Sequence, residues 1–395
     1  MAQRQFRSDD TSKWTPKYGN GADGDKVVSS NSTYDGANAG LASNANSGQK
    51  NVSIDSASSF ANGDVVLIHQ SRGTGAGAWE LNRIASGGGS TSLVMESDLI
   101  NNYVESGASQ AQVVELKQYK TLDVQSAKTW SAPVWDGSKG GILAFLCKGL
   151  ATITGTLSAK GADSANNNDN RPSGGGFRGG WSHDGTNSTG QQGESPTGDG
   201  SQSNSANGTG GGAGGGNANY NAGGGGGHAT AGASATGSNS TNGSGGGTAS
   251  DNAGMTNMVF GGGAGGATGT AGSSTASGAN GGGLVVAIAK TLTITGAINA
   301  DGGSNLSGAR VTGGAGAGGG VLIKGVAVTI GTNKISVAGG TCNSTPETGG
   351  AGGVGRIHVD YGKSLSGSAS PTAADTRQDK SLLDTMRGGS LLMQL

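Results

Sequence analysis

The chain has 395 residues, 83 of them glycine, with a net charge of −1 and a charged fraction of 13%. Hydrophobic residues make up 32% and aromatic residues 4%, which predicts thin cores. The balanced charge, with no basic stripe and no aromatic platform, excludes nucleic acid as a partner. No apolar stretch is long enough to span a bilayer, so we expect no membrane insertion.

Residues 1–48 are polar and contain isolated aromatic side chains at Trp14 and Tyr18. We expect an extended N-terminal arm that becomes ordered only against a partner. The opening sequence, MAQRQFRSDD, has no apolar core of a signal peptide. We therefore expect the protein not to be an ordinary secreted product, and to leave the cell inside a virion released by lysis.

Residues 49–130 change to short apolar runs separated by turn signals such as Asn62-Gly63. Runs of this length and spacing are typical of a small antiparallel barrel or sandwich. We expect it to act as an adaptor domain. The predicted strands are 52–54, 64–70, 78–84, 92–95, 112–117 and 121–124.

Residues 131–362 contain a repeat of alternating apolar and small polar residues rich in Ile, Val, Leu and Thr. Copies start at Gly141, Gly283 and Gly320, and a truncated fourth copy runs over 354–361. Because one copy has a single apolar face that it cannot bury alone, the copies must stack. The sequence predicts an all-β fold in which the stacked repeats form a β-solenoid or a sandwich.

The long glycine-rich stretch between the first two copies, from about 162 to 282, is too long for a structureless loop in a compact domain. It is either a disordered low-complexity segment or a bundle of extended threefold helices of the polyglycine-II type. In the second case each N–H must pair with a neighbouring strand. We expect the polyglycine-II helical bundle as an insert within the stacked repeats.

Residues 363–395 form a C-terminal tail that ends in the apolar sequence LLMQL. An apolar terminus docks on its own body or on a neighbouring subunit. We expect the N-terminal arm and this tail to contact other virion or filament subunits, and the protein to be a homo-oligomer.

The pattern of Gly-Gly, apolar strand, Thr-Ile-Thr-Gly and Ala-x-Gly-Gly, closed by GGAGGVGRIHVDY at 349–361, resembles glycine-rich repeat proteins of environmental bacteria and their phages. The glycine blocks, such as 223–227, are similar to the polyglycine-II tips of phage tail-fibre adhesins. This resemblance implies that loops between glycine helices contact a host surface receptor or glycan. It departs from those tips because strand repeats interrupt the glycine blocks here.

Motifs for chemistry are missing from the sequence. Matches to Gly-x-Gly-x-x-Gly, as at 261–266, do not link a strand to a helix, and the four histidines lack metal-ligand spacing. We predict no enzyme activity, no cofactor and no metal. Aromatic and histidine side chains in the glycine-rich region are the candidate receptor contacts, with capping of the glycine strands or an incidental surface role as the alternative: Phe177, Trp181, His183, Tyr220, His228 and Phe260.

These expectations combine into a non-enzymatic phage virion protein of the tail-fibre or adhesin type. It would display loops on a rigid polyglycine scaffold for host-surface binding. The first alternative is a bacterial extracellular filament or matrix protein at the cell surface. The second is an ice-binding protein, because glycine helices can present flat faces.

Overall fold

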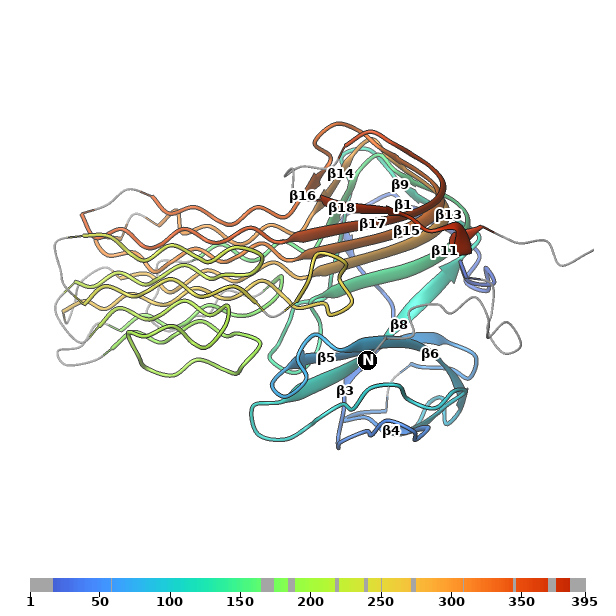
Figure 1. Cartoon of the computed structure of the whole chain (residues 1–395), viewed down its shortest axis with the longest axis horizontal. Coiled ribbons are helices and arrows are strands. Elements are labelled where there is room, and N and C mark those ends of the chain that lie inside the picture. The colour runs from blue at the N-terminus through green and yellow to red at the C-terminus, as the bar shows by residue number, and fades with distance from the viewer. Residues whose placement is uncertain are drawn as a thin grey trace, which may run out of the picture.

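The structure is a computed structural model, and it describes residues 17–57, 59–164, 174–183, 189–216, 220–237, 241–249, 251–270, 275–307, 309–343, 346–368 and 374–383. The described residues are nearly all β, which confirms the predicted class; their single helix is the 3-10 turn η1 (Lys380–Leu382). Two sheets and an antiparallel unit lie at one end, and long glycine-rich segments project from them (Figure 1). The first 16 residues of the expected arm and the tail beyond 383 lie outside the described residues.

The antiparallel unit contains six strands around a core of its own, which includes Phe60, Ile68 and Tyr103. The strands follow the order β4-β7-β6-β5-β8-β3, and an antiparallel bridge between Leu41 and Ile54 brings the ends of this order together. Their bounds are β3 (Asn38–Gly40), β4 (Asn51–Ser53), β5 (Val65–Arg72), β6 (Trp79–Ser86), β7 (Ser92–Met95) and β8 (Gln110–Tyr119). We call this unit the barrel. It includes β3, although residues 1–48 were expected to form the extended arm.

Strand β8 of the barrel also pairs with the first of a series of parallel strands. The barrel and the repeats therefore belong to one 13-stranded mixed sheet. The register confirms the alignment of the first two copies, since Ile142 pairs with Leu284. The third copy begins one residue earlier than the sequence alignment placed it, because Leu284 pairs with Gly320, and Gly320 pairs in turn with Arg356. The parallel strands are β11 (Ile142–Ile153), β13 (Leu284–Ile294), β15 (Gly320–Ile330), β17 (Arg356–Ser366) and β18 (Ala374–Gln378).

A second parallel sheet contains five short strands, three of which directly follow the long strands β11, β13 and β15. Its order is β2 (Ser32–Thr33), β10 (Thr129–Ser131), β12 (Thr156–Ser158), β14 (Ala297–Asn299) and β16 (Ile335–Ser336). The main core includes buried side chains of both sheets, among them Trp130, Phe145 and Leu157, because each repeat has a single apolar face to bury.

The residues from 17 to 48 are paired with the body over much of their length. Strand β1 (Asp25–Val28) pairs in parallel with β9 (Thr121–Val124), and β2 pairs with β10. The buried Tyr18 hydroxyl donates a hydrogen bond to the carbonyl of Leu382. The two ends of the described chain therefore meet on one surface.

Three glycine-rich excursions leave the sheets after a short strand and return to the next long strand: about 161–283, 300–319 and 337–355. We call their extended runs the glycine threads, and the end where they turn, opposite the sheets, the far end (Figure 1). Within their described residues the threads carry only isolated β-bridges and no helical turn.

Candidate functional site

The glycine threads are held together sideways by backbone hydrogen bonds. The N–H groups of Gly224, Gly225 and Gly226 donate to three different neighbouring threads, at the carbonyls of Ala213 (2.8 Å), Ala233 (2.9 Å) and Ala315 (3.0 Å). Successive residues of one thread thus point to different neighbours, unlike the residues of a β-strand, which alternate between two. Each inner thread is thereby fixed by several others.

Neighbouring threads approach too closely for side chains at many positions. A Cβ atom added to Gly224 would lie 2.0 Å from the carbonyl oxygen of Ser244, and one added to Gly225 would lie 2.0 Å from that of Ala351. On an outer thread, exposure follows a period of three: Ala229, Gly232 and Ala235 are half-buried, while the two residues after each are exposed.

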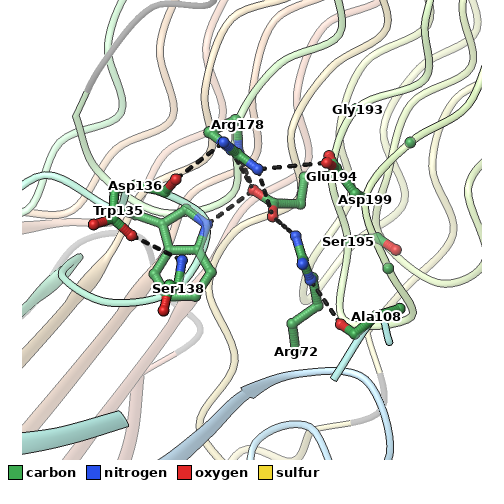
Figure 2. Close-up of polar contacts among 12 residues, drawn as sticks. Arg72, Ala108, Trp135, Asp136, Ser138, Arg178, Gly193, Glu194, Ser195 and Asp199 are labelled. Carbon is green, nitrogen blue, oxygen red and sulfur yellow. Dashed lines mark hydrogen bonds and ion pairs between the residues drawn. The ribbon is translucent and has the colours of Figure 1, made fainter. Parts of the chain in front are cut away.

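The threads join the barrel through a buried ion-pair network centred on Glu194 (Figure 2). Its fully buried carboxylate accepts hydrogen bonds from the Trp135 indole (2.8 Å), from the Arg178 backbone N–H (3.0 Å) and from the Arg178 side chain (3.2 Å). It also pairs with the guanidinium of Arg72, at the end of β5. We call this network the Glu194 joint.

Both arginines of the Glu194 joint have further partners. Arg72 donates through Nε to the carbonyl of Ala108 (2.8 Å), while Arg178 donates to the carbonyl of Asp136 (3.0 Å) and lies 3.5 Å from the Asp199 carboxylate. Burial on its own would lower the pKa of Arg178, but the charges of Glu194 and Asp199 outweigh it and raise that pKa. Arg178 therefore stays charged, and the joint links the barrel, the 131–140 loop and two threads.

Two of the predicted contact residues, Phe177 and Phe260, are buried where the threads meet the sheets. Their ring centroids lie 5.3 Å apart at 80°, and Trp135 lies 5.2 Å from Phe260. His69 of β5 packs 5.7 Å from Phe260, and its Nε2 contacts the Met258 carbonyl at 2.7 Å. The expectation of an exposed contact does not hold for Phe177 and Phe260, because these large rings fill space that glycine leaves empty.

A third candidate, His228, is also fully buried. Its Nδ1 lies 2.7 Å from the Gly318 carbonyl and its Nε2 lies 2.8 Å from the Asp251 carboxylate, which also accepts a 2.6 Å hydrogen bond from Arg356. Burial would raise the pKa of Asp251, but His228 and Arg356 lower it overall. His228 therefore ties threads together and is not available to a receptor.

The remaining three candidates lie on threads that are bridged to one another. The Trp181 side chain is 44% exposed, and on the same thread the His183 ring contacts Gln202 (2.7 Å). Tyr220 lies on another thread, and its hydroxyl accepts a hydrogen bond from Thr270 (3.1 Å). Thr268 brings these threads together, because it forms bridges with both His183 and Asn221.

Sequence reasoning missed the residues that carry the charge of these sites. Glu194, Arg72 and Arg178 are far apart in the chain, and no spacing pattern connects them. Arg310 was missed as well, because a single arginine in a glycine-rich segment carries no motif.

Among the residues that the structure describes, no group of three His, Cys, Asp or Glu side chains is placed to hold a metal ion. No helix within the same ranges is long and apolar enough to cross a membrane. Comparisons with protein-family models, with curated proteins and with solved structures found no match to this chain. Its function is therefore argued from its own residues.

Proposed function

We propose that the chain is a non-enzymatic virion protein of a phage, of the tail-fibre or adhesin type, which binds a host surface through the far end of its glycine threads. One observation carries the proposal. Trp181 and His183 lie on one thread and Tyr220 on another, and Thr268 bridges these threads through His183 and Asn221. The threads project away from the sheets to the far end (Figure 1). That end is free to meet a surface while the sheets remain attached to a particle.

The proposal includes a finer description of the fold, in which the repeats form a β-solenoid and the threads form a polyglycine-II bundle. The exposure period of three along 229–237 supports it, because a polyglycine-II helix has about three residues per turn. The three different neighbours of Gly224, Gly225 and Gly226 support it as well. Hydrogen exchange tests the bundle: the amides of 223–227 should be protected as strongly as those of β13, whereas unstructured glycine segments would exchange at once.

A bundle of this kind would favour binding by preorganisation. The contact side chains sit at the ends of threads whose backbone is already fixed by lateral hydrogen bonds, so little conformational entropy is lost on contact. Several copies on one particle would then add their weak contacts into a strong attachment.

The test uses the full-length protein and the particles that carry it. Replacing Trp181 with Ala should weaken cell binding about tenfold or more. Trp181 is exposed in the free protein, and aromatic side chains that become buried on binding contribute most of the binding energy of an interface. Leu150→Ala is the matched control, since Leu150 is exposed to 46% but lies on β11 in the sheets. Equal binding of wild type and Trp181→Ala would contradict the proposed contact surface.

Electron microscopy with a gold-labelled antibody against the glycine-rich insert tests the location. Label at fibre or tail tips would support the adhesin. Label along the particle body would instead make the chain a structural subunit, and label on filaments of uninfected cells would favour the bacterial filament protein.

A second candidate, ice binding, is favoured by the composition of an outer thread. Thr230, Ala233 and Thr236 are exposed at a regular spacing of three residues, and none of residues 200–250 is charged. Thermal hysteresis of the purified protein tests this candidate. Wild-type hysteresis that Ala233→Arg abolishes would support it, and a complete lack of hysteresis in the wild type would reject it.

A further inference from the structure

Arg310 is an exposed cation midway along the excursion 300–319, and its guanidinium is stacked on an aromatic ring. Its Cζ atom lies 3.9 Å from the ring centroid of Tyr220. Such a stack holds the planar group in place while its N–H edges stay open to a ligand. The side chain is therefore oriented before any partner arrives.

The charge of Arg310 is not neutralised by its surroundings. Among the described residues no carboxylate forms an ion pair with it, in contrast to Arg72, Arg178 and Arg356. Glu347 lies on the thread that is bridged to Val311, but its carboxylate is buried and is not an ion-pair partner of Arg310. Arg310 therefore presents a net positive charge on a surface where residues 200–250 contribute none.

The platform beneath Arg310 is fixed. Tyr220 has a φ of 64°, a conformation that costs a residue with a side chain about 1 kcal/mol or more, and it packs against a small buried cluster of Ala222, Ala267 and Val311. Its hydroxyl is held by the Thr270 hydroxyl at 3.1 Å. Strain of this kind persists where the surrounding structure over-determines it, and it occurs often at ligand sites.

From these observations we infer that Arg310, Tyr220 and Thr270 form a binding site for an acidic sugar, one that carries a carboxylate or a phosphate. The guanidinium would donate two parallel hydrogen bonds to the anionic oxygens, and the two hydroxyl groups would bind sugar hydroxyls. This inference rests on the proposed adhesin function and names the class of its receptor as an acidic surface glycan.

The experiment measures binding of three probes to the full-length protein by calorimetry: an oligogalacturonate, a mannose 6-phosphate oligosaccharide and a neutral oligosaccharide. We expect the acidic probes to bind more tightly than the neutral one, and the preferred acidic probe identifies carboxylate or phosphate as the source. Arg310→Gln should weaken acidic binding by about tenfold to a hundredfold. Arg310→Lys should recover only part of it, because an ammonium group lacks the two-pronged geometry.

The control variant is Arg83→Gln, which removes an arginine from β6 of the barrel and should leave glycan binding unchanged. Equal binding of acidic and neutral probes, or no effect of Arg310→Gln, would overturn the inference. Cell binding separates this result from the broader proposal. If wild type and Arg310→Gln bind cells equally, the acidic-sugar site is rejected and the proposed adhesin function is kept. If the wild type binds no cells, the adhesin function itself is rejected.

Discussion

Glu194 is the centre of the ion-pair contact between barrel and threads. Its buried carboxylate is shared by Arg72, Arg178 and the Trp135 indole. Glu194→Ala would leave two guanidinium groups without their anion, and we expect the free energy of unfolding to fall by about 3–5 kcal/mol. The measurement is denaturant unfolding followed by tryptophan fluorescence.

The control for that loss is Glu96→Ala, which breaks the partly exposed pair of Glu96 and Arg83 (3.3 Å). A pair of this kind contributes about 0–1 kcal/mol, because solvent screens it. An equal loss in the free energy of unfolding for the two substitutions would mean that the Glu194 joint stabilises the fold no more than a partly exposed ion pair does.

His69 makes the stability depend on pH. Burial lowers the pKa of His69 from 6.5 to about 4, although its hydrogen bond to the Met258 carbonyl opposes the shift. The unfolded chain therefore binds a proton at His69 before the folded one does, so the His69 contribution to stability is constant above about pH 7 and falls as pH decreases toward 4. The full difference corresponds to about 3 kcal/mol.

Chemical denaturation at a series of pH values measures this dependence, with His69→Gln as the comparison. The variant should lack the decrease between pH 6.5 and 4, and acid effects from carboxylates should remain in both proteins. Curves that run parallel over this interval would show that His69 does not titrate on unfolding.

Among the elements, the stacked strands could be predicted from the sequence and the lateral partners of the threads could not. The alternation of Ile, Val and Leu with small residues fixes which residues of β11, β13 and β15 face each other. Glycine has no side chain whose size or polarity could indicate which neighbouring thread it contacts. The sequence of 223–227 therefore contains no pattern that predicts its partners. For the same reason Phe177 and Phe260 seemed exposed, although they fill the space at the base of the threads.

Two glycines of one outer thread test whether close packing holds the threads together. A Cβ at Gly245 would lie 2.0 Å from the Gly232 carbonyl oxygen, whereas the nearest atom to a Cβ at Gly247 is 4.0 Å away. We expect Gly245→Ala to cost about 3 kcal/mol or more, because two hydrogen-bonded threads must separate. Gly247→Ala should be neutral or stabilising by up to about 1 kcal/mol, since it restricts the unfolded chain. Thermal unfolding of both variants measures the difference. Equal changes in stability for Gly245→Ala and Gly247→Ala would contradict close packing of the threads.

At the scale of the whole molecule, barrel, sheets and threads are connected at more than one point. Strand β8 pairs antiparallel with β5 in the barrel and parallel with β11 in the repeats, and the Glu194 joint adds a second connection. We therefore expect one cooperative transition in scanning calorimetry, with the amides of β5 and of 223–227 exchanging through the same global opening. Glu194→Ala removes the ion pairs of this second connection, although the contact of His69 with Met258 remains, and it should let the threads exchange before β5 does. Two separate transitions in the wild type would contradict this coupling, because the shared strand and the joint would then fail to transmit unfolding from one part to the other.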